Sequence, residues 1–164
     1  MFGNRKFIVS VSTCLVFILL IACSTEENLR RTTSNLTVTS IHDTVIARKT
    51  SVKKLKELYG EPYKIETDSQ KAIDLFNEIN NDEGSINTVL EDNTDYWDTL
   101  KVDYSSPIKG LDFEGYYEYR GKGLAGMRVY FFIIKDTVRS YWFYGDITDE
   151  SVAKKDKYLR QILD

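Results

Sequence analysis

Residues 128–144 read RVYFFIIKDTVRSYWFY, and this stretch decides the fold. Its first half, residues 129–134, is an unbroken apolar run, which is typical of a central strand covered on both faces. Residues 135–137 are short enough to form a hairpin turn, and residues 138–144 continue with a second strand-like run. The stretch therefore predicts two neighbouring antiparallel strands, the first of them central in its sheet.

A third strand is predicted just upstream, at residues 113–120. The link to the central strand is Gly121-Lys122-Gly123-Leu124-Ala125-Gly126, which spells the G-x-G-x-x-G pattern of a dinucleotide-binding turn. Such a site needs a strand before the motif and a helix after it, whereas a strong strand signal follows here. We therefore interpret the motif as a glycine-rich hairpin connection.

Two helices are predicted in the first half of the chain. Ser51 is a suitable N-cap for a helix over residues 52–59, which Gly60 would end. Asp68 or Ser69 would cap a second helix, whose apolar residues recur on one face. Both helices lie upstream of the strand-rich region.

The remaining segments are assigned by composition and order. Residues 36–47, rich in Thr, Val and Ile, predict a strand or bent strand pair, and residues 63–67 and 96–104 predict further strands. Residues 86–90 fit either a helix or a strand, and Asp149 would cap a last helix. This order predicts an α+β fold, with an antiparallel sheet of three to five strands and helices packed on one face.

The N-terminal residues have a different character. Arg5 and Lys6 precede an apolar run at residues 7–22, and Cys23 follows directly. The run is interrupted by polar residues and is too short for a spanning helix, which needs about 20 apolar residues. This is the layout of a bacterial secretory signal.

The end of the signal, Leu20-Ile21-Ala22-Cys23, resembles the lipobox of bacterial lipoproteins. The resemblance implies that Cys23 receives a diacylglyceryl group, that the chain is cut before it, and that the new amine is acylated. Two or three acyl chains hold a protein on a membrane without a spanning helix. By the same resemblance, Ser24 favours the outer membrane over the inner membrane, and Glu26 and Glu27 are similar to cell-surface signals.

Two alternatives to the lipobox are an uncleaved N-terminal anchor and a conventional signal. With the lipobox, the chain divides into a signal peptide at 1–22, a lipidated cysteine and flexible tether at 23–35, and a single α+β domain at 36–164.

Composition narrows the function classes. The chain of 164 residues has 22 Lys and Arg against 25 Asp and Glu, and loss of residues 1–22 changes the net charge from −3 to −5. A weakly acidic domain argues against nucleic acid as a partner. Cys14 leaves with the signal and Cys23 is alkylated, which excludes disulfides, thiol catalysis and cysteine-bound metals. We predict no cofactor and no metal.

Three arrangements resemble catalytic or ion-binding sites. His42, the only histidine, adjoins Asp43, but no G-x-S-x-G motif accompanies them, and we expect His42 to be an ordinary strand or turn residue. Glu114 and Glu118 share strand parity with Asp112 and could form a glycosidase pair, although the solvated face of a strand has the same spacing. An acidic stretch without the EF-hand pattern is expected to be a loop; its members are Glu91, Asp92, Asp95, Asp98 and Asp103.

Aromatic residues are concentrated between positions 96 and 144. Because the predicted strands carry them on both faces, we expect some to be exposed, unless helices cover both faces. Exposed Tyr and Trp on a sheet are effective contacts for proteins and glycans. The possible partner-binding residues are Tyr116, Tyr119, Tyr141 and Trp142.

Residues 52–62, VKKLKELYGEP, resemble the helix-then-G-x-P segment of the BamE/SmpA-like lipoproteins. That family has two helices before an antiparallel sheet, and the resemblance implies a non-catalytic scaffold that docks to envelope proteins. The chain departs from the family through a longer middle section at 68–110 and an added C-terminal helix. The later residues that are similar to the family's sheet are Tyr119, Gly123, Phe131, Phe132 and Val138.

These observations together predict a non-enzymatic, lipid-anchored envelope lipoprotein that binds a protein in the periplasm or at the cell surface. No residue is assigned a catalytic role. A surface inhibitor or immunity-type protein is one alternative. A glycan-binding lipoprotein or small glycosidase using Glu114 or Glu118 is another.

Overall fold

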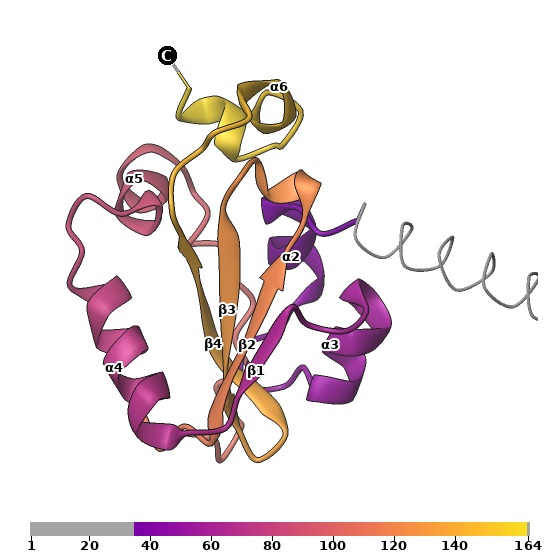
Figure 1. Ribbon diagram of the computed structural model, residues 1–164, viewed down its shortest axis with the longest axis vertical. Helices are drawn as coiled ribbons and strands as arrows, with labels where there is room; N and C mark the ends of the chain where they lie inside the picture. The colour runs from indigo at the N-terminus through magenta and orange to yellow at the C-terminus, as the bar shows by residue number, and fades with distance from the viewer. Residues whose placement is uncertain (1–34, 164) are drawn as a thin grey trace, which may run out of the picture.

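The computed structural model describes residues 35–163, which form an α+β domain around a four-stranded antiparallel sheet (Figure 1). The strands, in sheet order, are β1 (Lys64–Glu66), β2 (Gly115–Arg120), β3 (Arg128–Ile134) and β4 (Thr137–Tyr144). The helices are α2 (Val38–Thr44), α3 (Val52–Tyr59), α4 (Ser69–Asn80), α5 (Ile86–Asn93) and α6 (Glu150–Ala153), with short 3-10 helices η1 (Lys122–Leu124) and η2 (Leu159–Gln161).

The signal peptide, Cys23 and the tether up to residue 34 lie outside the described residues, and the predictions made for them stay predictions. Within the described part, no helix is long and apolar enough to cross a membrane.

The predicted meander of three strands is confirmed, and β1 adds a fourth strand beside β2. The β3–β4 hairpin turns at Lys135 and Asp136, whose φ angles are 49° and 54°. Two consecutive left-handed residues are the mark of a type I′ turn, whose twist matches that of the flanking strands. The turn sets Ile134 opposite Thr137 and so fixes the register of the hairpin.

Helices cover both faces of the sheet, with α4 on one side and α2 and α3 on the other (Figure 1). The expected sheet of three to five antiparallel strands is confirmed, but the expectation that helices pack on one face only is corrected. The reason lies in β3, which is apolar at every second position on each face and needs cover on both sides. Val129, Phe131 and Ile133 enter the core under α2 and α3, whereas Tyr130, Phe132 and Ile134 enter the core under α4.

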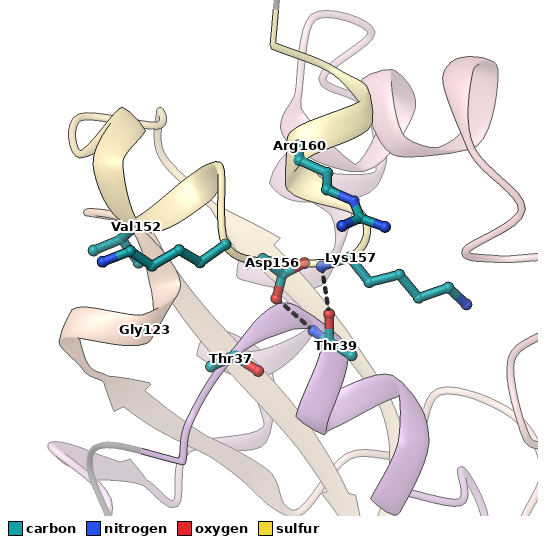
Figure 2. Close-up of a pocket in the computed structure, with 8 residues that line it drawn as sticks. Thr37, Thr39, Gly123, Val152, Asp156, Lys157 and Arg160 are labelled. Carbon is teal, nitrogen blue, oxygen red and sulfur yellow. Dashed lines mark hydrogen bonds between the residues drawn. The ribbon is translucent and has the colours of Figure 1, made fainter.

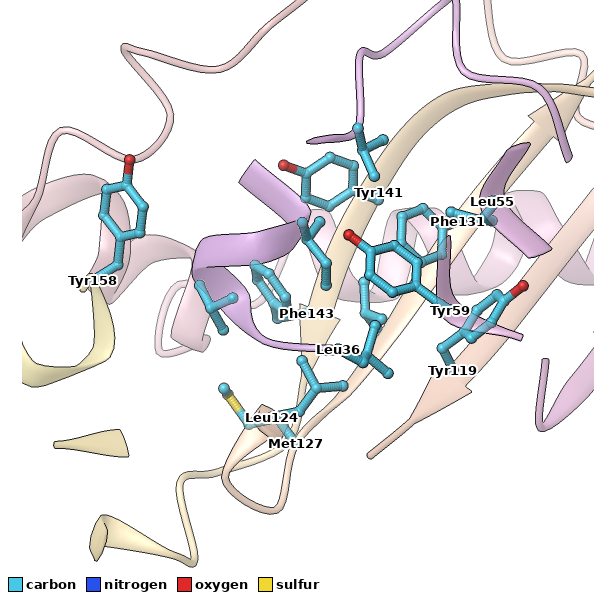
Figure 3. Close-up of a cluster of buried hydrophobic side chains, with 14 of the residues drawn as sticks. Leu36, Leu55, Tyr59, Tyr119, Leu124, Met127, Phe131, Tyr141, Phe143 and Tyr158 are labelled. Carbon is cyan, nitrogen blue, oxygen red and sulfur yellow. The ribbon is translucent and has the colours of Figure 1, made fainter. Parts of the chain in front are cut away.

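The larger core packs α2 and α3 against β2, β3 and β4 (Figure 3). Leu55, Phe131 and Phe143 are 0% exposed, and full burial of such a side chain stabilises the fold by about 1.5–3 kcal/mol. Tyr119 buries its ring here and donates its hydroxyl hydrogen to the carbonyl oxygen of Gly60 at 3.0 Å. This contact ties the end of α3 to β2.

Residues 36–47 were predicted as a strand or bent strand pair, and this is wrong: helix α2 occupies Val38–Thr44 of this range. Thr37 and Ser40 make a capping box, in which each side-chain oxygen accepts a hydrogen bond from the other residue's backbone N–H, at 2.9 and 3.0 Å. Val38 and Ile41, three positions apart, are 0% exposed on one helix face. Burial at helical spacing therefore outweighs the β propensity of Thr, Val and Ile, which is a weak preference.

Residues 96–104 were also predicted as a strand, and this is wrong: they form turns and a loop, in which Val102 makes an isolated parallel bridge to Ala47. Tyr96 is 0% exposed and its hydroxyl lies 3.0 Å from that of Tyr141. Trp97 donates from Nε1 to the carbonyl oxygen of Asn87 at 3.0 Å. The apolar signal here came from two rings that pack individually against the core, and the backbone of the segment pairs only at the isolated Val102 bridge.

The predicted helix starts are confirmed. Side-chain oxygens of Ser51, Asp68 and Asp149 each accept a hydrogen bond from a backbone N–H in the first turn of the helix that follows, which is the ordinary N-cap interaction. The ambiguous residues 86–90 belong to α5, and the last helix, α6, begins after Asp149 and ends at Ala153.

Candidate functional site

Three of the four aromatic residues predicted to meet a partner are buried. Tyr116 is 7% exposed, and Tyr119 and Tyr141 are each 2% exposed. Burial raises the pKa of both Tyr119 and Tyr141, while Tyr116 accepts a hydrogen bond from Lys64 at 3.2 Å. The expectation that these three rings form a contact surface is corrected, because helices on both faces of the sheet enclose them.

Trp142, the fourth predicted residue, is half-buried on the α4 face. Its ring centroid lies 6.3 Å from that of Phe76 and 5.0 Å from that of Trp97. Its indole Nε1 is buried without a hydrogen-bond partner among the described residues. The side chain mainly packs α4 and the 96–104 turns against β4.

Glu118 does not lie on a solvated strand face, contrary to expectation. It is 3% exposed and pairs with Arg120 on the same strand, and Arg120 in turn lies over the Tyr63 ring at 3.7 Å. Asp112 and Glu114, by contrast, are exposed. One carboxylate of the possible glycosidase pair is therefore enclosed in an ion pair while the other lies in solvent.

His42 is a buried helical residue, which corrects its expected position in a strand or turn. Its Nδ1 lies 3.0 Å from Asp43 Oδ1, and its Nε2 lies 2.9 Å from Thr99 Oγ1. The order Thr–His–Asp resembles a hydrolase triad, but the Thr99 hydroxyl donates its hydrogen to the Asp95 carbonyl oxygen at 2.7 Å. Thr99 therefore offers His42 an acceptor and is not poised as a nucleophile.

The same network reaches the C-terminal segment. The Tyr158 hydroxyl lies 3.1 Å from both ring nitrogens of His42, and Lys157 donates to that hydroxyl at 3.0 Å. The cluster thus joins α2, the turns after α5 and the residues after α6. Its contacts are those of a hydrogen-bonded buried histidine that holds three segments together.

The glycine-rich link between β2 and β3 is confirmed as a connection between strands. A Cβ on Gly123 would lie 2.5 Å from the Leu36 carbonyl oxygen, so the start of the domain packs directly on the link. Gly126 has a φ of 100°, and a Cβ there would lie 1.9 Å from Thr148 Oγ1. These glycines permit close backbone approach, and the residues after them form β3, not the helix that a pyrophosphate site needs.

A cationic groove of about 450 Å³ lies where the chain enters the domain (Figure 2). Its buried acid, Asp156, accepts hydrogen bonds from the backbone N–H groups of Thr39 and Tyr158 at 2.8 and 2.9 Å. Within residues 35–163, the exposed side chains of Lys155 and Arg160 form no ion pair. The residues that line the groove are Thr37, Thr39, Gly123, Val152, Lys155, Asp156, Lys157 and Arg160.

Four large apolar side chains are exposed in the described part, and none of them is among the four predicted partner-binding residues. Tyr63 and Ile65 lie on the β1 edge, at 65% and 45% exposure. Tyr104 and Leu111, at 79% and 42%, lie in the loop before β2. The flanking Ser and Pro residues of that loop were the available sign that Tyr104 is not in a strand.

Comparisons with protein-family models, with curated proteins and with solved structures find no match for this chain. Functional inference therefore depends on the residues described above.

Proposed function

We propose that this chain is a non-enzymatic lipoprotein of the bacterial cell envelope, anchored by lipid on Cys23 and carrying a protein-binding domain. The outer membrane is favoured over the inner membrane, as Ser24 suggests. The polar residues 24–35 act as a tether, and a flexible chain of that length spans about 20 Å. The domain would therefore remain close to the bilayer without entering it.

The observation that carries this proposal is the way the chain enters the domain. Leu36 is 1% exposed in the larger core, and Thr37 and Thr39 line the cationic groove. A lipid tether would thus hold the domain at the end that contains the cationic groove. Lys155 and Arg160 would then face the bilayer, whose anionic headgroups attract basic side chains within a Debye length of about 10 Å.

Support for a protein-binding role comes from the opposite end of the sheet. Tyr104 and Leu111 are exposed there: Tyr104 lies beside Arg48, whose N–H bonds to Val138, and Leu111 follows Gly110, which bonds to Arg139. Tyrosine and arginine are among the residue types that contribute most of the binding energy at protein interfaces. With the groove toward the membrane, this end would be free to meet another envelope protein.

The anchor is tested by replacing each cysteine in turn in the full chain. Cys23→Ser should abolish incorporation of labelled fatty acid and release the domain from the membrane fraction, because no acyl chain is then attached. Cys14→Ser is the matched control and should keep both, since Cys14 lies within the signal. A Cys23→Ser chain that still carries fatty acid and still sediments with membranes would refute the proposal.

A further inference from the structure

Arg48 and Arg139 lie together at the hairpin end of the sheet, and neither is neutralised. The backbone N–H of Arg48 donates to the Val138 carbonyl oxygen at 2.7 Å, which places it beside the residue that follows. Arg139 Nε donates to an uncharged acceptor, the Gly110 carbonyl oxygen, at 3.1 Å. Within residues 35–163, no carboxylate forms an ion pair with either arginine.

At least one N–H donor of the pair has no hydrogen-bond acceptor among the described residues. Arg48 Nε is buried and has no acceptor among the described residues. Burial, and then the charge of Arg48, lower the pKa of Arg139, as expected for two cations held close together. A guanidinium presents five N–H donors in a planar fork that matches the two oxygens of a carboxylate. The missing component of this arrangement is an anion.

The backbone at Arg48 adds a second observation. Its φ is 64°, in the left-handed region that glycine adopts without strain and other residues avoid. Arginine at this position is therefore unfavourable for the backbone. Strain of this kind is concentrated at functional sites, where the side chain has a role that glycine lacks.

Apolar side chains border the pair. The guanidinium carbon of Arg48 lies 5.8 Å from the ring centroid of Tyr104, which is 79% exposed. Leu111, 42% exposed, directly follows the glycine that binds Arg139. We call these four residues the distal patch: Arg48, Tyr104, Leu111 and Arg139.

Resting on the function proposed above, we propose that the distal patch docks a partner protein. Arg48 and Arg139 bind a carboxylate of that partner, and Tyr104 and Leu111 contact the apolar side chains beside it. A membrane headgroup is a poorer fit, because Leu36 enters at the other end of the sheet, against Gly123. The seven residues of β3 separate the two ends by about 20 Å.

The test places a photo-crosslinking amino acid at position 104 of the full chain in intact cells, with position 63, 65% exposed, as the matched control. We expect a protein adduct at position 104 whose mapped segment contains Asp, Glu or a chain terminus. Charge-assisted hydrogen bonds of ordinary strength predict that Arg139→Gln or Arg48→Gly reduces the adduct about tenfold. Replacing the partner's carboxylate by an amide should have the same effect.

Arg48→Gly also separates binding from folding. Glycine relieves the left-handed strain at this position, so the variant should unfold at the same or a higher temperature while losing the adduct.

Three results would overturn the proposal: no adduct at position 104, an adduct whose yield is unchanged by both arginine replacements, or an adduct to lipid. A protein adduct at position 63 alone would reject the distal patch and leave partner binding intact. Loss of the anchor is judged separately, by Cys23→Ser.

Discussion

Asn87 joins helix α5 to the outer edge of β4, and its replacement should destabilise the domain strongly. Its Nδ2 donates to the Phe143 carbonyl oxygen at 2.9 Å, and its Oδ1 accepts from the Phe143 N–H at 3.0 Å. The residue is 4% exposed. One side-chain amide thus supplies both hydrogen bonds that a neighbouring strand would give to this edge residue.

The magnitude follows from what Asn87→Ala leaves behind. Two buried hydrogen bonds are lost, each worth about 1 kcal/mol net, and the N–H and C=O of Phe143 are left unpaired at a further cost of about 1 kcal/mol. We expect the free energy of unfolding to fall by about 3 kcal/mol. Urea unfolding followed by tryptophan fluorescence measures it, because Trp97 packs at this junction.

Two further variants make the test specific. Asn93→Ala removes an exposed hydrogen bond within the same helix, to the Val89 carbonyl oxygen, and should change the stability by less than about 0.5 kcal/mol. Asn87→Asp keeps the acceptor but sets a carboxylate against the Phe143 carbonyl oxygen, and should destabilise at least as much as alanine. If Asn87→Ala unfolds within about 0.5 kcal/mol of the unaltered domain, the edge of β4 does not depend on this amide.

Three more predictions follow from buried polar groups and close contacts. His42→Ala should lower the free energy of unfolding by about 2–3 kcal/mol in a urea titration, because it unpairs a buried network; an unchanged midpoint would contradict that role. Gly126→Ala should lower the melting temperature more than Gly145→Ala, since the first Cβ would lie 1.9 Å from Thr148 Oγ1 and the second meets nothing within 4 Å. Equal losses would argue against close approach at the link. Burial raises the pKa of three tyrosines above the ordinary value of 10.0, so the stability that they contribute is complete below pH 10 and is lost as pH rises beyond it. The tyrosinate absorbance of these three residues, Tyr96, Tyr119 and Tyr141, should therefore appear together with alkaline unfolding, and ionisation of all three in the folded state would refute this.

Local patterns in the sequence were sufficient for the meander of β2, β3 and β4 and for the predicted helix starts. The apolar run at 129–134 and the polar turn after it specify β3 and β4, because a strand apolar on both faces must be central. Ser51, Asp68 and Asp149 act as N-caps through hydrogen bonds only two or three residues away. Signals of this range do not depend on the rest of the fold.

The candidate surfaces could not be read in the same way, because exposure is set by segments distant in the chain. Tyrosine is common in protein contact surfaces, yet Tyr116 and Tyr141 are buried because helices cover both faces of the sheet. Only the tertiary structure brings Arg48 beside Arg139, through a backbone hydrogen bond from the α2–α3 connection to β4. The sequence by itself thus determined the three-strand meander, because its signals are local, whereas long-range packing decided which side chains remain free to bind.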